Sequence, residues 1–215
     1  MVVPAVSKRL LISISEPIGS QFFKHMAINL TKGQRMDMPD GLQKIAVGLG
    51  WDPSGRPGEE FDLDASAFML AADKQIPAEG FFVFYNTLES SDRSVKSSGD
   101  DRTGGSSEGD DETLTVDLAK VDSRIEEIVF TVSIHDHESR RQNFGQVRNS
   151  FIRIYDAATQ VEICKYELGE DFSVETAVEF GRLYKRGGAW RFEAMGVGYK
   201  GGLDTFTTKY AKRFA

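Results

Sequence analysis

The stretch IVFTVSI, at residues 128–134, indicates the fold class more clearly than any other part of the chain. Its alternation places Ile128, Phe130, Val132 and Ile134 on one face of an extended segment. Because successive side chains of a strand point to opposite faces, this period predicts a strand that packs one face in a core. Similar short runs follow one another along the chain, broken by Gly, Pro, Asp and Asn. The sequence therefore predicts an all-β-dominated fold, a β-sandwich.

The remaining elements are expected from the same kind of periodicity. Further alternating runs lie at residues 45–51, 61–67, 114–118, 152–154, 161–166 and 190–194. Residues 80–85 are apolar on both faces, which is typical of an inner strand of a two-layer core. Two segments, 174–181 and 203–210, instead space their apolar residues as a helix does, so we expect two accessory helices.

The length and composition of the chain favour one folded domain. With 215 residues, of which 40% are hydrophobic, the chain can bury one substantial core. Patterning typical of strands begins only after Met26, so residues 1–25 are interpreted as an N-terminal extension without a structural role, and residues 26–215 as the domain. No run is long and apolar enough for a membrane span, and the short apolar stretch near the N-terminus lacks the features of a signal peptide.

The charge of the chain restricts its partners. The net charge of −7 repels nucleic-acid phosphates and anionic lipid headgroups, so neither nucleic-acid binding nor direct insertion into a membrane is expected. Cations and basic proteins are the natural partners. With Cys164 as its single cysteine, the chain forms no intramolecular disulfide.

Most of this charge lies in residues 97–113, which contain six acidic residues and one basic residue. The rest of the chain has 27 acidic and 25 basic residues and is nearly neutral. Six carboxylates so close together repel one another unless the segment stays solvated or cations bind to it. Calcium takes about six to eight oxygen ligands and needs a backbone that folds tightly around it, which the glycines of this segment permit. A flexible acidic connection is the alternative.

A second pair of carboxylates lies on the expected strand at residues 61–67. Asp62 and Asp64 are two residues apart, so their side chains point to one face, with Cα atoms about 6.5 Å apart. This spacing lets them share one ion or flank two. The ligand spacing of an EF-hand is absent, so calcium bound in loops at one end of the sandwich is the better interpretation. A solvated strand face is the alternative.

Successive blocks of the sequence resemble the TerD family, from about residue 26 to residue 210. The blocks are VGLGWD (47–52), FDLDAS (61–66), FYN (84–86), GDDRTG (99–104), EGDDE (108–112), IHD (134–136), QNFGQV (142–147), ETA (175–177), FGRLY (180–184) and GVGYKGGL (196–203). The resemblance implies a cytoplasmic β-sandwich that binds about two calcium ions at adjacent loops and takes part in resistance to tellurite and other stresses. It also implies protein partners in a stress-response complex, which can be membrane-associated.

The resemblance also implies a set of metal ligands. The carboxylates that match the family blocks are Asp62, Asp64, Asp100, Asp101, Asp110, Asp111 and Glu112. Asn86, Gly99 and Gly109 are expected to add amide or backbone oxygens. The chain departs from the family pattern at Asp101, where members commonly have Asn, and at Thr87, where they have a second Asn.

Catalysis is not expected, because no nucleophile lies near a base. The sequence GSSEG at 105–109 matches the pattern of a hydrolase nucleophile, but it lacks the preceding strand and following helix that the pattern requires. His135 and His137 would share one strand face, which offers too few ligands for a transition-metal site. A calcium-independent scaffold, docking partners through the charged segment 137–144, is the alternative function.

Overall fold

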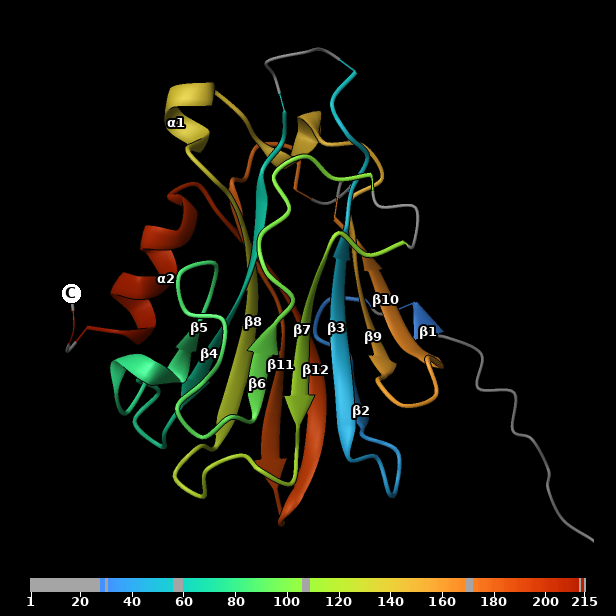
Figure 1. The fold of residues 1–215 in the computed structure, drawn as a ribbon, viewed down its shortest axis with the longest axis vertical. Helices are drawn as coiled ribbons and strands as arrows, with labels where there is room; N and C mark the ends of the chain where they lie inside the picture. Colours follow the sequence, from blue (N-terminus) through green and yellow to red (C-terminus); the bar gives the residue numbers. More distant parts are fainter. Residues whose placement is uncertain are drawn as a thin grey trace, which may run out of the picture.

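Two β-sheets of six strands each pack face to face in the computed structural model (Figure 1). The structure describes residues 28–29, 31–55, 60–105, 109–168, 172–212 and 214. The first sheet has the order β1-β10-β9-β3-β7-β6, and only its β1–β10 pair is parallel. Its strands are β1 (Ile28–Asn29), β3 (Lys44–Gly50), β6 (Val95–Ser97), β7 (Glu112–Asp117), β9 (Phe151–Asp156) and β10 (Glu162–Glu167).

The second sheet has the order β2-β12-β11-β8-β4-β5, with antiparallel pairs throughout. Its strands are β2 (Arg35–Asp37), β4 (Leu63–Leu70), β5 (Phe82–Val83), β8 (Glu127–Ile134), β11 (Ala177–Arg186) and β12 (Ala189–Tyr199). The helices are α1 (His137–Arg140) and α2 (Gly202–Tyr210), together with the 3-10 turns η1 (Glu79–Phe81) and η2 (Phe144–Gln146). The prediction of a β-sandwich with two helices is confirmed.

Helix α2 covers the outer face of the second sheet and contacts β8 and β11 (Figure 1). Phe206 of α2 meets Phe68 of β4 edge to face, with ring centroids 6.3 Å apart. The residues of β4 are therefore buried on both faces: one face meets the other sheet, and the other lies toward the helix. Asp64 lies two positions before Ser66 on the same face as Phe68, which explains how a carboxylate of this strand can be buried.

Two predicted elements are wrong. Residues 80–85 do not form an inner strand; they form η1 and then the two-residue strand β5 at the edge of the second sheet. Residues 174–181 do not form a helix, because from Ala177 onward the chain is β11, paired on both sides by β8 and β12. In both cases local apolar spacing was outweighed by pairing with distant strands. The helix expected at residues 203–210 is confirmed as α2.

The proposed extension, residues 1–25, lies outside the described residues. Within the described residues, none of the helices has the length and apolar character that crossing a bilayer requires.

Candidate metal site at one end of the sandwich

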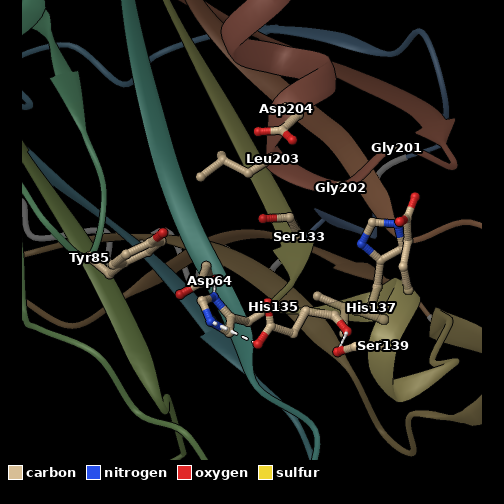
Figure 2. Close-up of a pocket in the computed structure, with 13 residues that line it drawn as sticks. Asp64, Tyr85, Ser133, His135, His137, Ser139, Gly201, Gly202, Leu203 and Asp204 are labelled. Atoms are coloured by element: carbon tan, nitrogen blue, oxygen red, sulfur yellow. Dashed lines mark hydrogen bonds and ion pairs between the residues drawn. The ribbon is translucent and has the colours of Figure 1, made fainter.

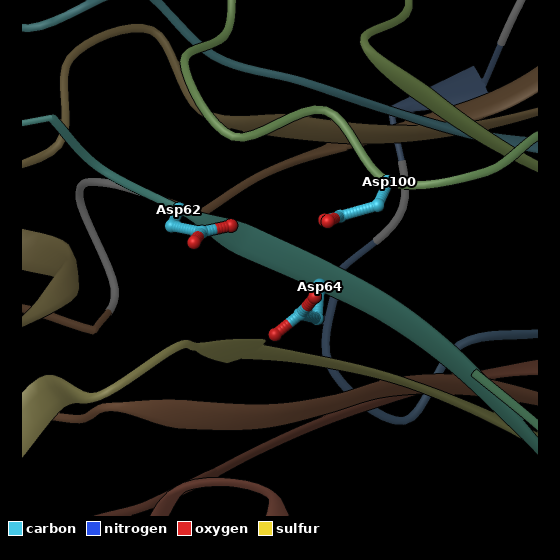
Figure 3. Close-up of side chains that lie close together, drawn as sticks. All are labelled: Asp62, Asp64 and Asp100. Carbon is cyan, nitrogen blue, oxygen red and sulfur yellow. The ribbon is translucent and has the colours of Figure 1, made fainter. Parts of the chain in front are cut away.

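Three carboxylates converge where β4 begins. Asp62 directly precedes β4, Asp64 is its second residue, and Asp100 comes from the connection between β6 and β7. One carboxylate oxygen from each residue lies within 4.8 Å of the others (Figure 3). Because β4 belongs to the second sheet and β6 and β7 to the first, the packing of the two sheets brings these residues together although they are far apart in sequence. Asp62, Asp64 and Asp100 are called the carboxylate cluster below.

Two members of the carboxylate cluster are almost fully buried. Asp62 and Asp64 are each only 3% exposed, whereas Asp100 faces solvent. Among the described residues, the buried Oδ1 atom of Asp62 has no hydrogen-bond partner. The prediction that Asp62 and Asp64 share one face is consistent with this arrangement, but their face is not solvated.

Compensation by neighbouring cations is weak. Arg140 Nη2 is 3.6 Å from Asp62 Oδ2, and His135 Nδ1 is 3.5 Å from Asp64 Oδ2. Both distances exceed the length of a strong charge-assisted hydrogen bond, which is about 2.7–2.9 Å. Because a buried anion is costly without close partners, the cluster carries an electrostatic penalty that a bound cation would remove.

The electrostatic cost of burying these carboxylates raises their pKa values. Burial raises the pKa of Asp64 to about 7, and the neighbouring Asp62 carboxylate adds to the increase while His135 opposes it. Burial also raises the pKa of Asp62 above its usual range, with His135 again opposing the change. Both carboxyls are harder to ionise in the folded chain than in water.

Glu112 joins the acidic loop to the second sheet. Its Oε2 atom accepts the backbone N–H of Ala65 at 2.7 Å, and its Oε1 atom accepts that of Asp101 at 3.1 Å. The residue is 3% exposed, and burial raises its pKa to about 8 despite these two hydrogen bonds. Glu112 therefore holds the loop that carries Asp100 against the strand that carries Asp64.

Three other predicted ligands have protein partners in this structure. Asp110 forms a bidentate pair with Arg153, at 2.7 and 2.9 Å. Asp111 Oδ2 accepts the backbone N–H of Trp51 at 2.8 Å. Asp101 Oδ1 accepts the backbone N–H groups of residues 103 and 104, at 2.9 and 3.0 Å. None of the three belongs to the group of carboxylates that lie within 4.8 Å of one another.

The predicted backbone and amide ligands lie in turns. Gly99 and Gly109 have φ angles of +113° and +103°, a region that favours glycine, so their positions in the acidic loop require this residue. Asn86 lies in the turn closed by the mutual backbone hydrogen bonds of Phe84 and Thr87. The structure leaves the ligand role of all three as a prediction.

The interpretation of His135 and His137 as neighbours on a strand face is wrong. Strand β8 ends at Ile134, Asp136 adopts a left-handed conformation with φ of +51°, and His137 begins α1. The chain turns between the two histidines. The GSSEG segment at 105–109 includes residues outside the described part of the chain.

The structure adds neighbours that sequence patterns did not indicate. Arg140 and His135 lie beside Asp62 and Asp64, and Arg153 pairs with Asp110. No spacing rule connects these residues, because the contacts depend on the register of distant strands. The only available signal was the excess of acidic residues, which says that compensating charges are needed but not where they come from.

An oxygen-only set of carboxylates suits a hard divalent cation such as calcium, because calcium takes carboxylates, carbonyls and water as ligands. The class of protein defined by the fold and the candidate site is thus a β-sandwich with a cluster of carboxylates at one end. The sequence profile of the TerD domain matches residues 26–210, and the chain belongs to the TerD domain family.

Similar proteins support this assignment. The chain is 45% identical to the tellurium resistance protein TerD of Alcaligenes sp, over 86% of this chain and 97% of that protein. It is 48% identical to general stress protein 16U of Bacillus subtilis (strain 168), over 86% of this chain and 97% of that protein. The crystal structure of the unknown-function protein SAV2460 superposes with a TM-score of 0.67 at 27% identity, covering 78% of this chain and 95% of the other.

Proposed function

We propose that this protein is a non-enzymatic, calcium-binding module of a cytoplasmic stress response that includes resistance to tellurite. In this proposal about two calcium ions order the loops at residues 97–113 and 62–66. The ordered loops then present a surface to protein partners in a stress-response complex. The relatives named for tellurium resistance and general stress support the physiological part of the proposal.

The observation that carries the calcium proposal is the convergence of Asp62, Asp64 and Asp100. Two buried carboxylates with raised pKa values and one unpartnered oxygen are unfavourable in the protein alone. A divalent ion supplies the missing charge and takes the free oxygen as a ligand. Further ligands are proposed from the acidic loop, with water completing the coordination.

Thermal unfolding in calcium, magnesium or chelator tests the proposal. A ligand at 100 times its dissociation constant adds about 2.7 kcal/mol, which raises the melting temperature of a domain of this size by roughly 5 to 11 °C. We expect calcium to give this shift and magnesium to give less, because magnesium dehydrates reluctantly and demands stricter geometry. An unchanged melting temperature in calcium would refute the proposal.

Single substitutions test whether the ion binds at the carboxylate cluster. Asp62→Asn should abolish the shift while leaving the chelated protein folded, because the amide keeps the shape of the side chain but not its charge. Asp40→Asn is the matched control: Asp40 is exposed and precedes β3, at the opposite end of the sandwich. Calorimetric titration of the wild type with calcium gives the number of ions, and titration of the two variants shows which change removes binding. Partner capture with and without chelator separates a calcium-dependent module from the calcium-independent scaffold.

A further inference from the structure

A cavity of about 650 Å³ lies beside the carboxylate cluster, between the start of α2, the α1 segment and the turn that contains Tyr85 (Figure 2). Asp64 belongs to the carboxylate cluster and also lines this cavity. The volume falls within the usual range of ligand sites, which is about 300–1,000 Å³. A long side chain of another protein would fit into this space.

Apart from two histidines, His135 and His137, the ionisable side chains that line the cavity are acidic. The lining contains four carboxylates, from Asp64, Asp136, Glu138 and Asp204, and it contains no lysine or arginine. A concave surface lined by one sign of charge concentrates the field and attracts the opposite sign. The cavity therefore favours a cationic group.

A polar side chain in the wall of the cavity provides a second, independent indication of a ligand. Ser133 is only 2% exposed and lines the cavity. Figure 2 shows its hydroxyl pointing into the space bordered by Tyr85 and Leu203. Within the described part of the chain no side-chain hydrogen bond of Ser133 is found, and its Oγ atom is not among the fully buried polar atoms that lack a partner, so the hydroxyl opens onto the cavity. A donor group inserted into the cavity would supply a hydrogen-bond partner.

The walls suit the apolar stem of a basic side chain. Tyr85 and Leu203 both border the cavity, and the Tyr85 ring is fixed edge-on against His135 with a centroid distance of 5.7 Å. Long basic side chains bury their methylene groups on such surfaces while the charged end reaches polar partners. The aromatic face adds an attraction for the cation.

An anionic ligand is disfavoured, although α2 begins at this cavity and a helix N-terminus attracts negative charge. The backbone N–H of Gly202 already donates to Thr176 Oγ1 at 3.3 Å. Asp204 already places a carboxylate in the first turn of α2. The attraction of the helix end is thus satisfied within the protein.

We propose that this cavity binds an arginine side chain of a partner protein, with its guanidinium between Ser133, Asp204 and Glu138. Arginine is favoured over lysine because its five donors, held in a rigid fork, match acceptors that lie in several directions. The three acceptors are not among the predicted calcium ligands. The cavity is therefore a docking site that goes beyond the calcium proposal and does not depend on it.

Titration with N-acetyl-arginine amide, followed by backbone amide NMR shifts in chelator, tests this proposal. Saturable shifts are expected at Ser133, Gly202 and Leu203. N-acetyl-citrulline amide, which has the same shape without the charge, is the control and should give no saturable shifts there. N-acetyl-lysine amide should bind more weakly than the arginine probe.

Variants separate a specific site from general acidity. Asp204→Asn combined with Glu138→Gln should weaken the arginine probe by about tenfold or more, because each change removes a charge-assisted hydrogen bond. Asp40→Asn combined with Glu126→Gln removes the same charge from exposed acidic residues outside the cavity and should leave affinity within about twofold under moderate salt screening.

Equal loss in both double variants, equal binding of citrulline, or saturation outside the cavity would each overturn the proposal. The calcium proposal fails separately, through the thermal shift. Binding of the arginine probe in chelator together with an unchanged melting temperature in calcium would leave the docking site standing and remove only the ion.

Discussion

The buried acidic residues at the two ends of β8 differ in how closely cations compensate their charge. The start of the strand, where the compensation is close, is called the matched end below, and the other end is called the unmatched end. At the start of β8, Glu127 is 3% exposed and forms ion pairs with Lys74 and with Arg182, whose Nη1 is 2.9 Å away. At its other end, Ser133 pairs in register with Asp64, which is equally buried. Asp64 has no such close cation among the described residues: its ion-pair partner is His135, whose Nδ1 lies 3.5 Å from Asp64 Oδ2.

At the matched end, the ion pair between Glu127 and Arg182 is part of a larger network of ion pairs. Arg182 also donates to Glu193, which accepts Arg35 as well, at 2.7 and 3.0 Å. Burial opposes the ionisation of Glu193, yet hydrogen bonds from Arg182 and Arg35 hold its pKa below its usual range. These acids are paired within the protein itself.

This difference in charge compensation indicates a different role for each end of β8. A buried ion pair with good geometry needs nothing from outside, and its role is structural. A buried carboxylate cluster without close cations needs an external charge, so it is the better candidate for ligand binding. Burial alone does not distinguish a candidate ligand site from a structural ion pair, but burial together with missing charge compensation does.

The largest effect is expected at the unmatched end: in the presence of chelator, the contribution of Asp64 to the free energy of unfolding should depend on pH. Because the pKa of Asp64 is about 7 in the folded chain and near 4 when unfolded, the folded state retains a proton that the unfolded chain has released between these pH values. Stability contributed by Asp64 therefore falls as pH rises through this window, by about 4 kcal/mol in total.

Urea unfolding of the wild type and of Asp64→Asn, from pH 4.5 to 8, measures this contribution as a difference. The variant should become progressively more stable than the wild type as pH rises, and saturating calcium should abolish the wild-type decline. Parallel curves for the two proteins in chelator would contradict the comparison.

At the matched end, Arg182→Met should lower the free energy of unfolding by about 3 kcal/mol, because it removes a close partner of the buried Glu127 carboxylate. Arg182→Lys, which keeps the charge, should lose less. The loss should be the same in calcium and in chelator, measured by urea unfolding at pH 7. A loss that calcium reverses would mean that the two ends are coupled.

The smallest effect is expected at Asp110, which the resemblance to the TerD family implies as a metal ligand and which the structure pairs with Arg153. Asp110→Asn should cost about 1.5 kcal/mol of stability through the lost charged hydrogen bonds. Calcium affinity, measured by calorimetry, should change much less than in Asp62→Asn. A loss in Asp110→Asn as large as in Asp62→Asn would restore Asp110 to the ligand set and require Arg153 to move away.

The site was predictable in part for a physical reason. The two-residue period puts Asp62 and Asp64 on one face wherever the strand lies, so their proximity follows from local geometry. Their burial does not, because it depends on how β4 packs within the sheet and on the loop that carries Asp100. Nor does the pairing of Asp110, because Arg153 reaches it from β9 across the neighbouring strands.

By itself the sequence determined the sandwich, the C-terminal helix, the concentration of acidic residues and the family. These features follow from local alternation, composition and short motifs. Only the tertiary structure decided that residues 177–186 form a strand, that residues 80–85 begin with a turn, and which carboxylates converge. Those outcomes depend on pairing between residues far apart in the chain, where the energy of packing and of charge compensation outweighs local preference.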